Sequence, residues 1–121
     1  MKRIRILAMA VALAAAISLP VYAFHNHLTK STPAEDEELA ASPTAIRLWF
    51  AEKVEPKFSS ITLMTADSAK IEVAKPKATD DPKSVVSDLA APLAAGTYLV
   101  RWRTAGDDGH AVRGTYQFKV K

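Results

Sequence analysis

The chain contains no cysteine, and this absence removes several classes of function at once. It can form no disulfide, offer no thiolate to a metal ion and use no thiol as a nucleophile. The sequence also lacks a Gly-x-Ser-x-Gly elbow, a phosphate-binding loop and a zinc-type histidine pair. In an oxidising compartment, packing alone must therefore hold the domain together.

Methionine and histidine are scarce as well. Met64 is the only one of the 3 methionines beyond residue 23, whereas a Cu(I) site built on thioethers needs several. The 3 histidines, His25, His27 and His110, are confined to two short segments near the two ends of the chain. A site that uses histidines of both segments must bring these two segments together.

The first 23 residues are typical of a cleavable export signal. Basic residues precede an uncharged, almost wholly apolar run at residues 6–19, which is short for a membrane span, and an A-x-A-like site ends at Ala23. A retained anchor is the alternative, and the short run followed by that site disfavours it. Cleavage after Ala23 leaves Phe24 first and cleavage after Phe24 leaves His25 first, and both remain open. We predict a signal peptide at residues 1–23, a single mature domain at residues 24–121 and a periplasmic location.

Removal of the signal changes the charge of the protein. The precursor has 16 Lys+Arg against 13 Asp+Glu, but Lys2, Arg3 and Arg5 leave with the signal, so the mature net charge is near zero. The pI of 9.3 therefore describes the precursor. Nucleic-acid binding would need a clustered basic face, and we expect no nucleic-acid partner.

Apolar and polar residues alternate with a period of two along much of the mature chain, as in half-buried β-strands. The alternation is found at residues 46–50, 61–63, 71–73, 85–89, 98–102 and 116–120. Such short segments, separated by proline and glycine, predict an all-β antiparallel sandwich or barrel. The expected core includes Leu48, Phe50, Tyr98, Trp102 and Phe118.

Three further segments are less regular. Residues 28–32 could add a first strand, and residues 75–83 are polar, contain two prolines and predict a long loop. Within residues 33–42, the seven residues 34–40 have helical composition, but so short a segment between two prolines cannot form a stable helix alone. We expect a solvated loop or a single turn there.

The two histidine segments supply a set of donors that suits Cu(II). Processing would place a free α-amine beside the imidazole of His25, and Asp108-Gly109-His110 supplies a carboxylate and a second imidazole. Nitrogen and oxygen donors in a square or tetragonal arrangement are typical of Cu(II).

Four blocks of the sequence form an ordered pattern: His25-x-His27-Leu28-x-x-Ser31-x-Pro33, Ile46-x-Leu48-x-Phe50-x-Glu52-x-Val54, Pro92-Leu93-x-x-Gly96-Thr97-Tyr98-x-Val100-x-Trp102, and Asp108-Gly109-His110-x-x-x-Gly114-x-Tyr116-x-Phe118-x-Val120. In this order they resemble the CopC family of periplasmic copper-binding proteins. Together they span nearly all of the mature chain. One block alone would be weak evidence, because Gly-Thr-Tyr before a strand is common in sandwiches.

The resemblance implies a cupredoxin- or immunoglobulin-like Greek-key fold that binds one Cu(II) per chain without enzymatic turnover. The family site uses the N-terminal histidine through both amine and imidazole, together with the Asp-x-His motif. Those positions here are His25, Asp108 and His110, and Glu52 matches an acidic position close to the metal. The resemblance also implies that the protein buffers or delivers copper in copper homeostasis or resistance, with an inner-membrane copper-transport protein of the CopD type as the expected partner. The mature form is expected not to be embedded in the membrane.

Each of these residues also has a simpler interpretation. His110 could be a surface-loop histidine and Asp108 a turn residue, with Asp107 an equal source of carboxylate; the family spacing selects Asp108. We expect His27 to be a partly buried strand residue rather than a ligand. Trp49 and Trp102 are interpreted as packing residues rather than a redox pair.

Two other functions compete with copper binding. A metal-free immunoglobulin-like interaction module of the cell envelope would give no special role to the N-terminus. A copper oxygenase would need two imidazoles and an amine around an open copper on an extended substrate face. This small domain contributes a carboxylate and shows no aromatic-rich substrate surface, so the oxygenase ranks last.

Overall fold

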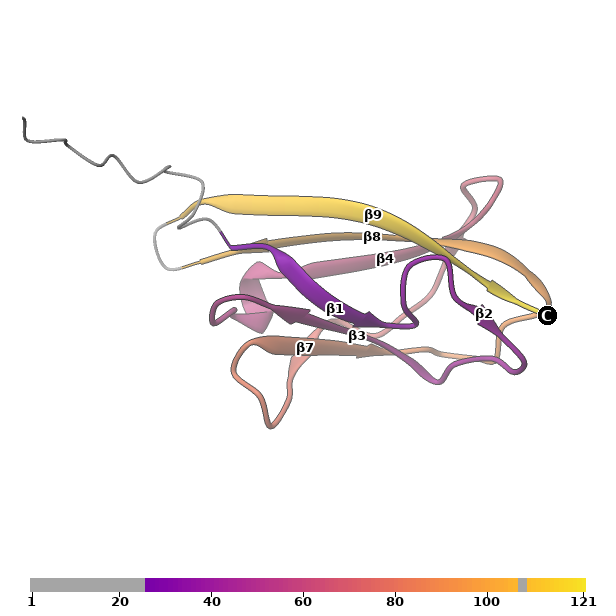
Figure 1. Cartoon of the computed structure of the whole chain (residues 1–121), viewed down its shortest axis with the longest axis horizontal. Coiled ribbons are helices and arrows are strands. Elements are labelled where there is room, and N and C mark those ends of the chain that lie inside the picture. Colours follow the sequence, from indigo (N-terminus) through magenta and orange to yellow (C-terminus); the bar gives the residue numbers. More distant parts are fainter. Residues whose placement is uncertain (1–25, 107–108) are drawn as a thin grey trace, which may run out of the picture.

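The computed structural model describes residues 26–106 and 109–121, and these residues form two β-sheets that pack face to face (Figure 1). The four-stranded sheet has the order β1 (Leu28–Thr32), β3 (Ala45–Phe50), β7 (Ser84–Asp88), β6 (Lys77–Ala78). The five-stranded sheet has the order β2 (Glu38–Leu39), β9 (Ala111–Val120), β8 (Gly96–Ala105), β4 (Ser60–Thr65), β5 (Lys70–Ile71). One 3-10 turn, η2 (Pro56–Phe58), lies between β3 and β4. The fold is therefore the all-β sandwich that the alternation predicts.

The core lies between the sheets because each strand turns its apolar side chains inward. In β3 the buried and half-buried residues alternate strictly, and β8 and β9 repeat this pattern over most of their length. The five core residues expected from the sequence are all buried: Leu48, Phe50, Tyr98, Trp102 and Phe118. Edge-to-face packing of Phe50 on Trp102, with ring centroids 5.3 Å apart, joins the two sheets directly.

Strands β8 and β9 form a long antiparallel hairpin with an unbroken register from Gly96↔Val120 to Ala105↔Ala111. At its tip, the Gly109 N–H donates to the carbonyl of Gly106 at 3.0 Å, and Gly109 adopts a φ of 82°. This left-handed conformation favours glycine, which explains the Asp-Gly step in the sequence. The hairpin therefore presents its tip at one end of the sandwich.

The structure corrects three expectations. Residues 33–42 contain β2, which pairs in parallel with β9, so the sheets are not antiparallel throughout. Backbone bonds such as Lys119 N–H to the Glu37 carbonyl, at 2.8 Å, extend this pairing and cover the C-terminal half of the β9 edge. Residues 75–83 are not wholly loop, because β6 pairs with β7. Val73 lies outside β5 and forms an isolated bridge with Leu89.

Across the residues that the structure describes, no helix has the length and apolar character needed to cross a membrane.

Candidate metal centre

The chain enters the sandwich through a side-chain clamp at Asn26. The Oδ1 atom of Asn26 accepts hydrogen bonds from the backbone N–H of Glu52, at 2.8 Å, and from the N–H of His27, at 3.0 Å. Its Nδ2 atom donates to the carbonyl of Glu52 at 3.4 Å. The amide of Asn26 thus bonds both backbone groups of Glu52, as a paired strand residue would. This clamp fixes the start of the described chain, directly after His25, against the loop that follows β3.

His27 does not lie in a strand and is exposed, so the expectation of a partly buried strand residue is wrong. The physical reason is that β1 begins one residue later, while the His27 carbonyl accepts a hydrogen bond from Ala51 N–H at 2.9 Å. The backbone of His27 is therefore fixed on both sides, since its own N–H is bonded to Asn26. His27 is exposed to solvent, although its backbone N–H and carbonyl are both hydrogen-bonded.

Glu52, the acidic residue expected close to the metal, follows β3 and has an exposed side chain. Its backbone is bonded to Asn26, so it lies beside the segment that leads to His25. A carboxylate is thus present where the N-terminal donors enter the fold. Its contact with a metal ion stays a prediction.

His110 is exposed at the tip of the β8–β9 hairpin, and its carbonyl accepts a hydrogen bond from Gly106 N–H at 3.3 Å. The two other predicted ligands, His25 and Asp108, lie outside the described residues, as does Asp107. Of the proposed ligand set, the structure therefore places only His110.

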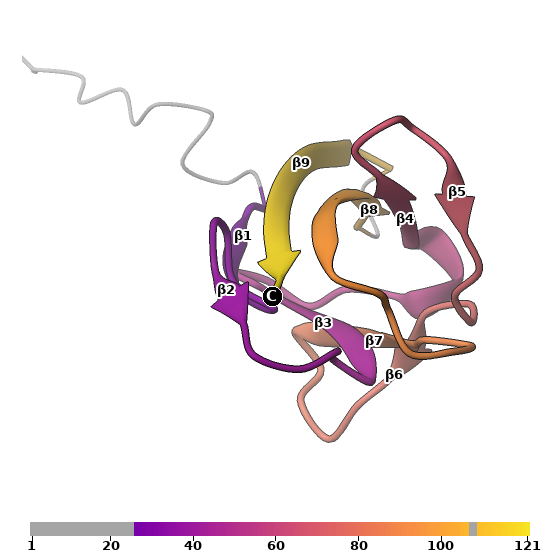
Figure 2. The same ribbon diagram turned by 90° about the vertical axis from the view of Figure 1, so that its right-hand side faces the viewer.

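A chain of contacts nevertheless connects the N-terminal segment to the hairpin. Leu28 is in register with Phe50, the ring of Phe50 packs on Trp102, and Trp102 is in register with Gly114, four residues after His110. Strands β1 and β9 lie side by side along the open side of the sandwich (Figure 2). The sequence segments that contain His25 and Asp108 are thus attached to the same end of the molecule.

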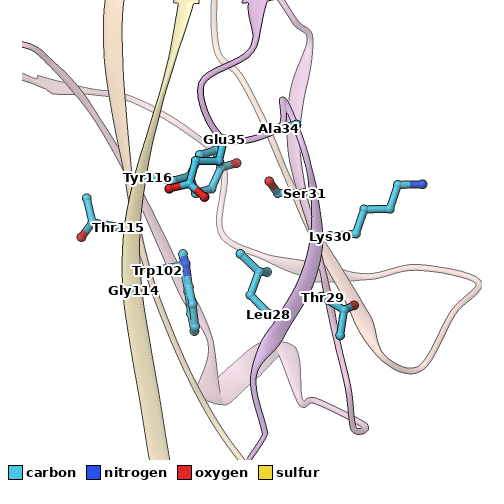
Figure 3. Close-up of a pocket in the computed structure, with 10 residues that line it drawn as sticks. All are labelled: Leu28, Thr29, Lys30, Ser31, Ala34, Glu35, Trp102, Gly114, Thr115 and Tyr116. Carbon is cyan, nitrogen blue, oxygen red and sulfur yellow. The ribbon is translucent and has the colours of Figure 1, made fainter.

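A groove of about 540 Å³ runs between β1 and β9. Leu28 from β1 and Trp102 from β8 face one another across it (Figure 3). The Tyr116 hydroxyl also lies at this groove, where it is buried and has no hydrogen-bond partner. Burial raises the pKa of Tyr116 to about 12, with a further increase from Glu37. The nearby Ser31 hydroxyl opposes the shift, although the two hydroxyls do not meet the geometry of a hydrogen bond.

The side chains predicted as ligands offer nitrogen and oxygen atoms, and the only methionine in the described part of the chain lies apart from them. Met64 lies in β4 and is 5% exposed, and its neighbours in register are Leu99 and Lys70. Within residues 26–106 and 109–121, no three His, Asp or Glu side chains are grouped closely enough to hold a metal ion. A site with three such donors would therefore need at least one residue outside these ranges, where the predicted ligands His25 and Asp108 lie.

Sequence reasoning missed Asn26. Asparagine is known for bonding to nearby backbone, and its place two residues before a strand was the available signal. Its partner is Glu52, however, 26 residues away, and sequence spacing does not reveal such a long-range bond.

Comparison with known proteins agrees with this architecture. The CopC domain family model matches residues 28–121. The chain is 42% identical to the copper resistance protein C of Pseudomonas syringae pv. tomato over 103 residues, which cover 80% of this chain and 81% of that protein.

Two solved structures have the same fold. CopC from Methylosinus trichosporium OB3b superposes with a TM-score of 0.74 at 34% identity, covering 80% of this chain and 94% of that one. PcoC from Escherichia coli, described as a methionine-rich copper resistance protein, gives a TM-score of 0.72 at 37% identity, covering 80% and 99%. The present chain differs from a methionine-rich protein, because only Met64 lies beyond residue 23.

Proposed function

The chain belongs to the CopC family, and from this premise we propose that it is an exported periplasmic protein that binds one Cu(II) per chain and buffers or delivers it. The proposal includes cleavage of residues 1–23, so that residues 24–121 form the mature domain. The observation that supports it best is the contact path from Leu28 through Phe50 and Trp102 to Gly114, because it links the strand that follows His27 to the hairpin that contains His110.

The proposed ligands are His25, Asp108 and His110. His25 would bind through its imidazole and through a backbone nitrogen, which is its own α-amine if His25 is the first residue or its amide if Phe24 is the first. Glu52 is available beside them, because its backbone is bonded to Asn26. An exposed His27 could form a separate amine–amide–imidazole chelate if His25 were the first residue. That chelate would have to displace the 3.0 Å hydrogen bond from His27 N–H to Asn26, which favours the hairpin ligands.

Selectivity for Cu(II) over Cu(I) follows from the available donors. Cu(I) prefers soft thiolate and thioether ligands, whereas imidazole, amine and carboxylate suit Cu(II). The chain has no cysteine, and Met64 is buried in β4. The role proposed is non-catalytic: the protein carries copper, and an inner-membrane protein of the CopD type is its proposed partner.

The decisive experiment compares correctly processed protein with protein that keeps a tag before Phe24. The tag removes the free amine beside His25 but leaves Asp108 and His110 in place. We expect the processed protein to bind Cu(II) at least tenfold more tightly in a competition titration, because two ligands on one loop cannot define the coordination geometry alone. The two titrations require equal pH, since every nitrogen donor competes with protons.

Three single variants refine the comparison. His110→Ala and His25→Ala should each remove most of the affinity, whereas His27→Ala should change it little. Equal Cu(II) affinity of the tagged and processed proteins would show that the N-terminus is no ligand. Absence of Cu(II) binding by the processed protein would instead favour a metal-free interaction module.

A further inference from the structure

The outer face of the five-stranded sheet has a cluster of arginines next to the hairpin tip. Arg101 and Arg103 lie on β8 and Arg113 on β9, and all three are exposed. They occupy the positions that alternate with inward-facing residues such as Trp102, so they point away from the core. Arg103 and Arg113 are direct cross-strand partners.

Among the described residues, these arginines differ from Arg47, the fourth arginine beyond residue 23, in having no acidic partner. Arg47 is paired with Asp80 at 3.1 Å, and Lys77 with Asp88 at 2.9 Å. Among the residues described, no carboxylate forms an ion pair with Arg101, Arg103 or Arg113. Like charges directly opposite one another in a sheet are destabilising, so this arrangement has a cost in the isolated domain.

Neither folding nor metal binding accounts for the cluster. Positive charges beside a cation site oppose the binding of that cation. Of the four arginines beyond residue 23, three are in this cluster, while the nine lysines are spread over the chain. Arginine is the cation enriched in protein interfaces, because its planar guanidinium binds carboxylates in a bidentate manner.

The arginine cluster lies close in sequence to His110, the predicted copper ligand of the hairpin, and, through strand pairing, near an exposed aromatic residue. Arg113 is three residues after His110, and Arg103 is in register with Ser60. Phe58, two residues before Ser60, is 45% exposed and is the one large apolar side chain that the described residues expose. Arginine and aromatic residues together are typical of the positions that dominate binding energy in interfaces.

We propose that Arg101, Arg103 and Arg113 form a docking face for a carboxylate-bearing extended segment of the protein that exchanges copper with this one. The inference rests on the proposed function for the nature of the partner. Residues two apart on a strand are separated by about 6.7 Å, so carboxylates at alternate positions of an extended segment match Arg101 and Arg103. Docking there brings the partner to the hairpin that contains His110.

A 12-residue peptide of alternating Glu and Ser tests this face against the same peptide with Gln in place of Glu. We expect the Glu peptide alone to bind the processed protein, with amide shifts in the NMR spectrum centred on the three arginines and an affinity that falls as salt is raised. Arg103→Glu/Arg113→Glu should weaken binding at least tenfold. The control Lys75→Glu/Lys83→Glu makes the same change in net charge on exposed residues elsewhere and should weaken it less than twofold.

Equal loss in the two double variants would show that binding follows net charge and would overturn the docking face. A second outcome would also overturn the docking face: the protein binds phosphatidylglycerol vesicles through Arg103 and Arg113 but does not bind the peptide. The face would then recognise lipid. Arg103→Gln/Arg113→Gln gives a second variant should charge reversal prevent folding. Cu(II) titration of the same samples separates the two proposals: peptide binding without Cu(II) binding contradicts the copper function, and the reverse contradicts only the docking face.

Discussion

Gly114 has no side chain because the indole ring of Trp102 occupies the space where a β-carbon would lie. A Cβ at this position would be 2.6 Å from Trp102 Cζ2 and 2.9 Å from its Nε1. We expect Gly114→Ala to destabilise the protein by about 1–3 kcal/mol, because a rigid, buried ring must move. Urea unfolding followed by tryptophan fluorescence measures the change. Thr115→Ala, at the exposed neighbouring position, should stay within about 0.5 kcal/mol, and an equal loss there would contradict the steric explanation.

Tyr116 and Tyr98 provide a contrast between an unbonded and a bonded hydroxyl. The Tyr98 hydroxyl donates to the Ala94 carbonyl at 2.6 Å, whereas the buried Tyr116 hydroxyl has no partner. At neutral pH, Tyr98→Phe should cost about 1 kcal/mol, and Tyr116→Phe should be neutral or stabilising, because it removes a buried polar group without breaking a bond.

The pKa of Tyr116 adds a pH dependence with a defined sign. Its pKa rises from 10.0 to about 12 on folding, so the folded state retains a proton that the unfolded state loses in that range. The stability associated with the neutral phenol is complete below pH 10 and is lost between pH 10 and 12, a loss of about 2–3 kcal/mol. Urea unfolding at pH 9 and pH 12 should therefore show a smaller loss for Tyr116→Phe than for the unsubstituted protein. Identical losses would mean that Tyr116 ionises normally in the fold.

At the scale of the element, β1 owes its position to pairing with β3 and to the Asn26 clamp. Asn26→Ala removes both bonds to Glu52 and frees the chain that leads to His25. We expect at least fivefold weaker Cu(II) binding, since a ligand that is less well positioned must be ordered on binding. Asn26→Asp keeps the acceptor and should retain most of the affinity.

Thr29→Ala is the matched control for the clamp. It removes one exposed hydrogen bond of β1, from Thr29 Oγ1 to the Trp49 carbonyl at 3.2 Å, and leaves both bonds between Asn26 and Glu52 in place. Its Cu(II) affinity and electron paramagnetic resonance spectrum should be unchanged, whereas Asn26→Ala should alter the spectrum. Equal effects of the two variants would assign Asn26 a merely structural role.

The alternation in the sequence was sufficient to predict β3, β4, β7, β8 and β9, because each places apolar residues on one face of a half-buried sheet. It could not predict β2 and β6, which have two residues each and therefore no period to detect. The side chain of Trp49 was correctly interpreted as packing on a sheet face, where Lys30 and Arg47 lie over its ring. At the site, residue types and family spacing pointed to His110, but the clamp by Asn26 depends on tertiary contacts that no local pattern encodes.

On the scale of the whole molecule, the proposed metal would join the two sheets along their open side. His25 leads into β1 of the four-stranded sheet, and His110 precedes β9 of the five-stranded sheet. Strands β1 and β9 form no ladder with each other among the strand pairs of the described chain. A shared Cu(II) ion would therefore add a cross-link between them, and its free energy of binding would oppose the detachment of β1.

Hydrogen exchange measures this cross-link. With free Cu(II) at 100 times the dissociation constant, the bound state gains about 2.7 kcal/mol, so amides that exchange only when β1 detaches should exchange about 100-fold more slowly. We expect this protection in β1 and at the beginning of β9, with little change in β5 and β6, which lie at the opposite edges of their sheets. The tagged protein should show no comparable protection, because it lacks the free amine. Uniform protection of all strands would mean that β1 opens only with the whole domain, whereas protection confined to the hairpin would show that Cu(II) binds there without joining the sheets.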